Sequence, residues 1–180
     1  MRPIFTIHAG EYLVANELEH KYPDLRVWVP SKDTGIDLLV TDKSGQKVAS
    51  LQVKFSKDHL ATGREKKATP KIKSGGWWSF KAEKIESSQA DYWVLVLSES
   101  ISRNFDYLII SPKKLLEIYR KIGKENATTI QTYFWVTNAR KCWETRGLGQ
   151  DELVRVCEGN FESKDRDFSQ YLNEWPFERA

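Results

Sequence analysis

Three polar side chains occupy alternate positions in two strand-like segments and could act together on one substrate. Asp37 lies in the segment Ile36–Thr41, and Gln52 and Lys54 lie in the segment Val48–Ser56. Side chains alternate between the two faces of a strand, and the positions between these polar residues are apolar. The three polar side chains should therefore share the face turned away from the packed helix. Paired strands lie about 5 Å apart, which is close enough for the three groups to surround one metal ion or one phosphate.

Glu11 is a fourth candidate, because its helix places it on an apolar face. The segment Gly10–Tyr22 has the periodicity of an amphipathic helix. Glu11 precedes Val14 by three residues and Leu18 by seven, so its carboxylate shares their face. An unpaired charge at such a position is costly to bury. A metal ion or Lys54 would provide the partner that this carboxylate needs.

Together these residues form a pattern that resembles the PD-(D/E)xK nuclease superfamily. The pattern is Glu11, then Gly35-Ile36-Asp37, then Gln52-Val53-Lys54, with 14 residues between the aspartate and the glutamine. The superfamily includes restriction enzymes, Holliday-junction resolvases and repair nucleases. The resemblance covers roughly Glu11 to Leu97, about half of the chain, and includes the family's order of helix, three meander strands, helix and strand.

Two positions depart from the family pattern. Gly35 and Ile36 stand before the aspartate in place of the proline, and Gln52 replaces the usual acidic residue. A Q-x-K version occurs in some type II restriction enzymes and in at least one homing endonuclease of this fold. It lowers the negative charge at the metal, so the number of metal ions stays open.

The resemblance implies a Mg²⁺-dependent endodeoxyribonuclease acting on double-stranded DNA, with Mn²⁺ as a possible substitute. Asp37 would be the main metal ligand, with the Gln52 side-chain oxygen, the Val53 carbonyl and Glu11 beside it. Lys54 would orient or deprotonate the attacking water and stabilise the developing charge. Mg²⁺ prefers oxygen ligands, activates water and screens the phosphate.

A basic segment follows the expected active strand. Residues 57–84 hold eight Lys or Arg and three Asp or Glu, whereas the other 152 residues hold 20 and 22. The segment is predicted to neutralise DNA phosphates, and two tryptophans within it could stack on bases. The alternatives are a solvated surface for the charges and core packing for the tryptophans. The predicted DNA contacts are Lys57, Arg64, Lys66, Lys67, Lys71, Lys73, Trp77 and Trp78.

The remaining elements follow from hydrophobic periodicity and turn residues. The polar turn Lys43–Gln46 predicts a hairpin between the two site-bearing segments, and the continuous apolar run Tyr92–Leu97 predicts a strand buried on both faces. Pro70 and Gly75-Gly76 indicate irregular backbone. Further helices are expected at Phe80–Gln89, Pro112–Ile122 (with Ser111 as N-cap) and Phe168–Trp175, and further strands at Arg26–Val29, Asp106–Ile110 and Gln131–Thr137.

These elements predict an α/β protein with a mixed central sheet flanked by helices. Residues 1–125 would form a restriction-endonuclease-like core. Residues 126–180 would form an additional C-terminal α+β extension packed on it, in a single compact domain overall. The length of 180 residues and the 22 aromatic residues fit one packed core.

Composition narrows the possible settings. The longest apolar run, Tyr92–Leu97, is far shorter than the ~20 residues of a membrane span, and Cys142 and Cys157 form no metal-binding or disulfide pattern. A cytoplasmic protein without membrane contacts is expected. Because both strands of a duplex must be cut, a homodimer or higher homo-oligomer is expected. A Holliday-junction resolvase or repair nuclease of the same fold, and a non-catalytic DNA-binding relative, remain alternative functions.

Overall fold

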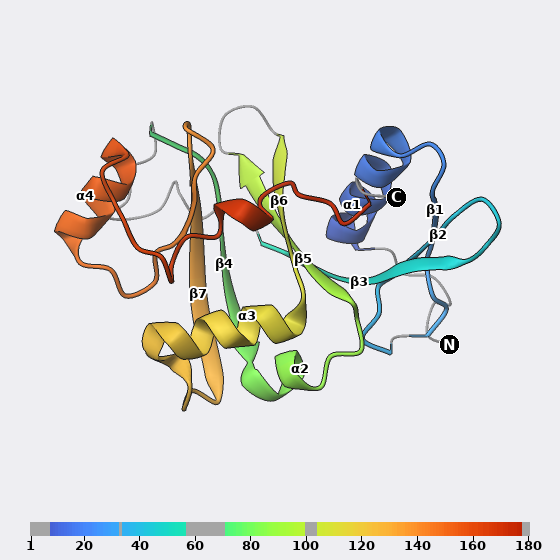
Figure 1. The fold of residues 1–180 in the computed structure, drawn as a ribbon, viewed down its shortest axis with the longest axis horizontal. Coiled ribbons are helices and arrows are strands. Elements are labelled where there is room, and N and C mark those ends of the chain that lie inside the picture. Colours follow the sequence, from blue (N-terminus) through green and yellow to red (C-terminus); the bar gives the residue numbers. More distant parts are fainter. Residues whose placement is uncertain (1–7, 33, 57–70, 100–103, 178–180) are drawn as a thin grey trace.

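The computed structural model describes residues 8–32, 34–56, 71–99 and 104–177. Its helices and strands, in chain order, are α1 (Ala9–Lys21), β1 (Arg26–Trp28), β2 (Leu38–Thr41), β3 (Lys47–Phe55), β4 (Ile72–Lys81), α2 (Ala82–Glu86), β5 (Tyr92–Glu99), β6 (Phe105–Ile110), α3 (Pro112–Tyr119), the kinked turn η3 (Arg120–Lys124), β7 (Thr129–Thr137), β8 (Cys142–Glu144), α4 (Gln150–Glu158) and the 3₁₀ turn η4 (Ser169–Tyr171) (Figure 1). Within the described ranges, no helix is long and apolar enough to cross a membrane.

The strands form one mixed sheet of eight strands. β1, β2 and β3 make an antiparallel meander, and β3 pairs in parallel with β5. β6 pairs antiparallel with β5. β4 touches β5 at only two pairs, Ser74 with Glu99 and Gly75 with Ser98, and then diverges to pair with β7, which in turn pairs with β8. The divergence of β4 from the central strands opens the space in which the candidate site lies.

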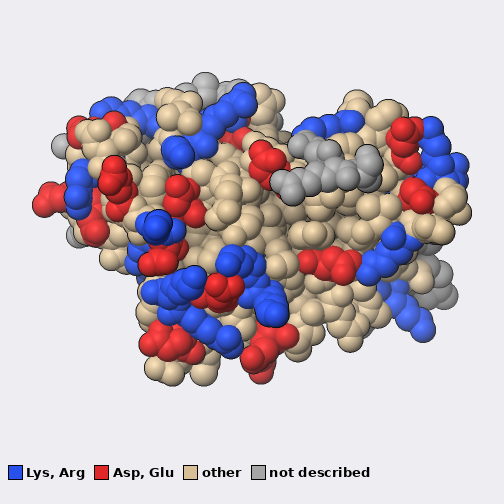
Figure 2. Space-filling model, in the orientation of Figure 1, with Lys and Arg blue, Asp and Glu red and all other residues tan. Residues whose placement is uncertain are grey.

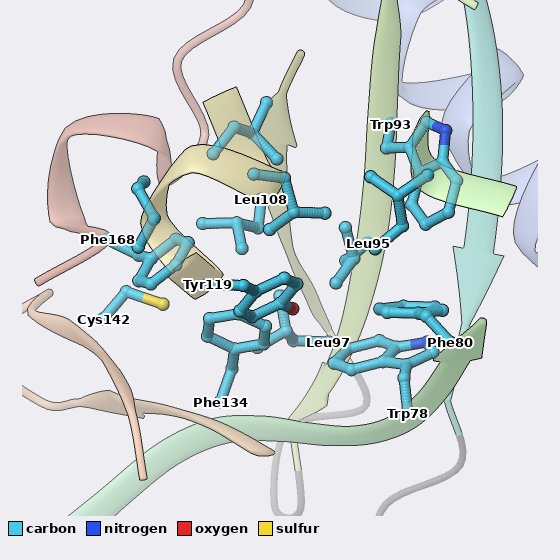
Figure 3. Close-up of a cluster of buried hydrophobic side chains, with 14 of the residues drawn as sticks. Trp78, Phe80, Trp93, Leu95, Leu97, Leu108, Tyr119, Phe134, Cys142 and Phe168 are labelled. Atoms are coloured by element: carbon cyan, nitrogen blue, oxygen red, sulfur yellow. The ribbon is translucent and has the colours of Figure 1, made fainter. Parts of the chain in front are cut away.

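β5 is the central strand, and both of its faces are buried. Val94 and Val96 on one face pack with α1 and with the meander strands. Trp93, Leu95 and Leu97 on the other face pack with α3, β4 and β7, and Figure 3 shows the side chains that meet there. The helices therefore cover opposite faces of the central strands, with α1 on one side and α2 and α3 on the other (Figure 1).

The C-terminal part of the chain continues this architecture. β7 pairs with β4 from Ile72 to Lys81, and Phe168 enters the core beneath α3 while Trp175 enters the core beneath α1. A third cluster, which includes Trp135 and Val156, joins β7 to α4. The extension thus shares its hydrophobic cores with the preceding part of the chain.

Several sequence expectations are confirmed. β2 and β3 form the predicted hairpin, and the run Tyr92–Leu97 lies within β5 with residues from both faces at 0–1% exposure beyond the first. Ser111 caps α3 by accepting a hydrogen bond from the Lys114 amide, and Pro112 is its first residue. These features depend on local pattern, which the sequence displays directly.

Other expectations are wrong. The backbone at Gly75-Gly76 is not irregular but belongs to the ten-residue strand β4. A Cβ at Gly76 would lie 2.3 Å from the Trp78 ring, so glycine is present there to make room for an indole. The helix expected at Phe80–Gln89 is limited to α2, and the one expected at Phe168–Trp175 is limited to η4. β8 and α4 were not anticipated.

Candidate active site

The four residues proposed as catalytic all line one cleft, of about 960 Å³. Its position follows from the divergence of β3 and β4, with Trp93 of β5 between them. One wall carries Glu11 and His8, the base carries Asp37, Gln52 and Lys54, and the opposite wall comes from the end of β4, from α2 and from the following loop. The other lining residues are Thr34, Gly35, Val53, Trp78, Ser79, Phe80, Lys81, Lys84, Ser87, Ser88, Gln89 and Trp93.

Asp37 is fixed at the edge of β3, where the pairing with β2 ends. The last residue pair of the hairpin is Leu38 with Leu51, and the Asp37 amide donates to the Leu51 carbonyl at 2.9 Å. Beyond this point the Asp37 side chain takes the place of the missing strand, because its Oδ2 accepts the Val53 amide at 2.7 Å. The carboxylate is therefore held by the backbone of β3 and lies beside its open edge.

Side chains alternate between the two faces of β3, so Val53 points away from Gln52 and Lys54. The Val53 amide points to the Asp37 edge, and the amide and carbonyl of one strand residue point in the same lateral direction, so the Val53 carbonyl faces this edge too. The Val53 side chain packs against α1, whereas Gln52 and Lys54 project from the opposite face into the cleft. Gly35, with φ +83°, brings the preceding loop close to the Gln52 amide, since a Cβ there would lie 3.9 Å from Nε2.

Glu11 reaches the cleft because α1 approaches β3 very closely at Gly10. A Cβ at Gly10 would lie 2.6 Å from the Phe55 Cβ, so any larger residue would push the first turn of the helix away. Glu11 itself is buried, at 9% exposure. Its Oε2 accepts the His8 backbone amide at 3.2 Å, a bond that satisfies one free donor of the helix terminus. The predicted burial of Glu11 is confirmed, and helix capping is one of its tasks.

Lys54 is half-buried above an aromatic floor. Its Nζ lies 5.4 Å from the centroid of the Trp93 ring, a distance typical of a cation–π contact. Trp93 stands next to Phe80, with ring centroids 5.2 Å apart in an edge-on arrangement. Both aromatic rings are at least nine-tenths buried. The lysine side chain is thus supported by packed apolar groups, while its position in the cleft allows it to face an anion.

The wall after α2 is fastened to β3 by Asp91. Its Oδ2 accepts hydrogen bonds from the Ser50 amide at 2.8 Å and from the Ser50 hydroxyl at 2.7 Å, and Lys47 lies 2.8 Å away. Partial burial alone would raise the pKa of Asp91, but the hydrogen bonds from Lys47 and Ser50 outweigh it and lower the pKa below 3.8. This wall was missed in the sequence, where the polar turn Ser87-Ser88-Gln89 was included in a longer helix.

The donor atoms in the cleft suit a hard cation. Among the described residues, nothing donates a hydrogen bond to Asp37 Oδ1 or to the Gln52 side chain. These two oxygens and the Val53 carbonyl are the kind of ligand that Mg²⁺ accepts. In the same part of the chain, no three or more His, Cys, Asp and Glu side chains are grouped to hold a metal, so an all-acidic metal centre is not present there.

The predicted DNA-binding residues of the basic segment differ in position and in partners. Lys57, Arg64, Lys66 and Lys67 lie outside the described residues. Lys71 and Lys73 stand at the start of β4, whereas the cleft lies along its second half, at about 3.3 Å per residue. Lys73 lies 2.9 Å from both Glu99 and Asp106, and its role as a DNA contact stays a prediction.

The two tryptophans of this segment differ in exposure. Trp78 is a core residue at 6% exposure, with its ring stacked on Phe80 at 6.4 Å between centroids. This burial agrees with the alternative of core packing, while Trp78 also belongs to the lining of the cleft. Trp77 is 37% exposed, and Ser56 holds its backbone through hydrogen bonds to both the amide and the carbonyl. Trp77 keeps the exposure that stacking requires.

Outside the cleft, the visible face of the molecule carries mixed charge. Figure 2 shows Lys and Arg interspersed with Asp and Glu over the region of α3. There Glu117 pairs with Lys114 at 3.0 Å and with Lys121 at 3.1 Å. Such mutually neutralised side chains do not form a continuous basic surface for a phosphate backbone.

Comparisons with known proteins give no match: no family model fits the chain, and neither the curated proteins nor the solved structures contain a significant relative.

Proposed function

We propose that this protein is a Mg²⁺-dependent endodeoxyribonuclease that hydrolyses phosphodiester bonds in double-stranded DNA. Its closest functional analogues would be type II restriction or homing endonucleases of the PD-(D/E)xK superfamily. One observation carries the proposal: Asp37 just before β2, Gln52 and Lys54 of β3, and Glu11 of α1 line the same cleft. The presence of all four groups in one cleft, and not the Q-x-K sequence alone, supports the proposal.

The order of elements supports this proposal. α1 is followed by the meander β1–β2–β3, and α2 precedes β5, which pairs in parallel with β3. This is the succession that the superfamily resemblance implies, with β4 inserted between β3 and α2. α1 and the pair α2 and α3 cover opposite faces of β5, as a three-layer nuclease core would require.

The residues of the cleft have complementary tasks in this reaction. A bound Mg²⁺ would act as a Lewis acid that activates water and neutralises the phosphate. Asp37 Oδ1, the Gln52 amide oxygen and the Val53 carbonyl would hold it, and Glu11 would bind it directly or through water. Lys54 would orient the attacking water and stabilise the charge that develops on the phosphate oxygens. Val53 would keep Asp37 in place through the 2.7 Å hydrogen bond to Oδ2.

Incubation of the purified protein with plasmid, linear duplex and synthetic four-way junctions, in Mg²⁺ or Mn²⁺, tests the proposal. The control is Asp37→Asn, which removes the charge but retains an oxygen that can accept the Val53 amide. We expect discrete plasmid fragments from the native protein and none from the variant. Equal cleavage by both proteins would refute the site. A duplex cut on both strands would further imply a homodimer or higher homo-oligomer, which sedimentation would reveal.

A non-catalytic DNA-binding relative is the second candidate, and Gln52 favours it. Where an acidic ligand is usual the chain has an amide, and the described residues contain no cluster of three acidic or metal-binding side chains. Such a protein would bind DNA with a steep salt dependence and would cut no substrate in either metal. Cleavage of four-way junctions with linear duplex left intact would instead identify a resolvase of the same fold.

A further inference from the structure

The wall of the cleft opposite Glu11 carries two lysines and a serine that could bind a phosphate. We propose that Lys81, Lys84 and Ser88 form a second phosphate subsite, which binds a backbone phosphate near the one held at Asp37 and Lys54. This inference rests on the proposed function, because it assumes a polymeric phosphodiester substrate. It states that the cleft holds at least two phosphates of one nucleic-acid strand.

The lysines of this wall are not occupied by strong internal ion pairs. Lys84 is exposed and makes no ion pair or hydrogen bond with any described residue. The nearest partner of Lys81 is Glu83, 3.9 Å away, and both side chains are about 70% exposed. Exposed ion pairs of this kind contribute little to stability, so both ammonium groups are available to bind an anionic ligand.

Two other lysines of the described chain are paired with buried carboxylates. Lys124 lies 2.8 Å from Glu144, whose side chain is fully buried. Lys73 has two carboxylate partners at 2.9 Å. A cation whose charge is already neutralised inside the protein gains little from a phosphate. Lys81 and Lys84 therefore differ from these lysines in the property that anion binding requires.

Ser88 adds a hydrogen-bond donor beside these charges. Its Oγ accepts the Trp93 indole N–H at 2.9 Å, which orients the hydroxyl oxygen toward the cleft floor. A serine hydroxyl that accepts in this way still has its own hydrogen to donate. Phosphate oxygens accept hydrogen bonds from serine hydroxyls as well as from lysines, so Ser88 completes a set of one hydroxyl and two ammonium groups.

The backbone of this wall is held before any ligand arrives. Lys81 pairs with Thr129 at the end of β4, and the next amide, that of Ala82, donates to the Thr128 carbonyl at 3.0 Å. At the other end, Asp91 is bound to Ser50 of β3 by side chain and backbone. Little ordering of the backbone is therefore needed when the ligand binds, which favours affinity.

The charges of the cleft are arranged for a polymer and not for a lone metal ion. Asp37 and Glu11 lie on the β3 and α1 side, and Lys81 and Lys84 lie on the α2 side of the same space. At about 960 Å³ the cleft is at the upper end of the ~300–1,000 Å³ that is usual for ligand sites. The acidic side suits a cation at the scissile phosphate, and the basic side suits a neighbouring phosphate.

The first test measures DNA binding in the Asp37→Asn background without added metal, so that no cleavage interferes. The variant is Lys81→Gln with Lys84→Gln, and the matched control is Lys141→Gln with Lys164→Gln, two exposed lysines outside the cleft. We expect the cleft variant to bind duplex about tenfold more weakly and to flatten the slope of log affinity against log salt by about 0.9, the value for one phosphate. Equal losses in variant and control would overturn the subsite.

The second test locates the phosphate. Single phosphates of a short duplex that the protein binds are replaced one at a time by neutral methylphosphonate. If the subsite exists, one replacement should weaken binding to the protein with Lys81 and Lys84 intact and have no further effect on the double variant. Independent, additive losses at every position would overturn the proposal. Because both tests measure binding, a native protein that cuts no DNA would refute the nuclease function while leaving this inference to stand or fall separately.

Discussion

Two aspartates of this molecule, Asp37 in the cleft and Asp106 in the core, differ in how many hydrogen bonds their carboxylates accept. In the cleft, Asp37 uses one carboxylate oxygen for the Val53 amide, and Oδ1 accepts nothing from the described residues. By contrast, Asp106 of β6, which faces the start of β4, is 2% exposed and has both oxygens engaged. Its partners are Lys73 at 2.9 and 3.0 Å, Ser74 at 2.6 Å and Asn173 at 2.9 Å.

The electrostatics of the Asp106 group follow from this difference. Burial alone would raise the pKa of Asp106, but the bonds from Ser74, Asn173 and Lys73 outweigh it and lower the pKa below 3.8. Burial alone would lower the pKa of Lys73, but Glu99 and Asp106 raise it above 10.5. The buried Asp106 carboxylate and the partly buried Lys73 ammonium, bonded in this way, join β4, β6 and the C-terminal segment.

The number of hydrogen-bonded oxygens distinguishes a carboxylate that stabilises the fold from one that can bind a ligand. A buried carboxylate with every oxygen bonded has nothing left for a ligand, and its removal leaves a buried partner uncompensated. A carboxylate with an uncommitted oxygen at an open sheet edge contributes less to folding and more to binding. Activity should depend on the cleft residues, and stability should depend on the Asp106 group.

The largest expected effect is on stability. Asp106→Ala should lower the free energy of unfolding by about 3–5 kcal/mol, because Lys73, Ser74 and Asn173 lose a buried partner. Urea denaturation measures this loss. The matched control is Asp165→Ala at an exposed position, where a change within about 0.5 kcal/mol is expected. A similar small change for Asp106→Ala would show that the buried group is not stabilising.

The next prediction compares one lysine from the cleft with one lysine from the Asp106 group. Lys54→Met should reduce the cleavage rate by about 10²–10³-fold, since it removes a charge that stabilises the transition state. Its unfolding free energy should change by about 1 kcal/mol or less, the size of an exposed cation–π contact. Lys73→Met should do the reverse, with lower stability and an unchanged rate per folded molecule. Equal effects of both variants on cleavage would mean that the two groups are not functionally distinct.

A smaller effect is expected from the helix that carries Glu11. Gly10→Ala places a Cβ 2.6 Å from the Phe55 Cβ, and relief of this overlap should cost about 1–3 kcal/mol of stability. The resulting displacement of Glu11 should also reduce cleavage. Thermal unfolding and plasmid cleavage are the measurements. At Gly149 the nearest atom to a new Cβ would be 3.6 Å away. Gly149→Ala should therefore leave cleavage unchanged and cost only about 0.5–1 kcal/mol of stability, because Gly149 is the N-cap of α4.

Gln52→Glu tests the metal site, because it replaces the amide by a carboxylate of nearly the same size. A carboxylate binds a hard divalent cation more tightly than an amide oxygen does, so Mg²⁺ affinity in the absence of DNA should rise by about tenfold, or ~1.4 kcal/mol. Activity should be kept, or its metal preference should shift. Calorimetry measures the affinity. A fall in metal affinity would show that Gln52 is not a ligand.

The smallest expected effect is the acid response of the buried group. Because the pKa of Asp106 is lower in the folded protein than its usual 3.8, its contribution is present in full well above pH 4 and is lost as the pH falls through the folded pKa. Urea denaturation at neutral pH and near pH 3 should show a smaller acid loss in Asp106→Asn than in the native chain. Parallel curves for the two proteins would contradict this assignment.

Local pattern in the sequence was sufficient for the central part of the candidate site. The alternation of Val48–Ser56 and the helical spacing of Glu11 placed four residues that the structure brings to one cleft. The hairpin β2–β3 and the buried strand β5 were predicted for the same reason. Side-chain direction in a strand or helix is fixed by backbone geometry over a few residues, so it can be derived without knowledge of the rest of the chain.

The opposite wall was decided by tertiary structure alone. β4 leaves β5 and pairs with β7, which lies about 50–65 residues later in the chain. Lys81 at the end of β4 and Lys84 in α2 then line the cleft, whereas Lys73 at the other end of β4 meets Asp106. All three lysines belong to the same basic segment, and no local pattern distinguishes them. Their roles differ because the partners that neutralise a charge, or leave it available, come from distant segments that only the fold brings together.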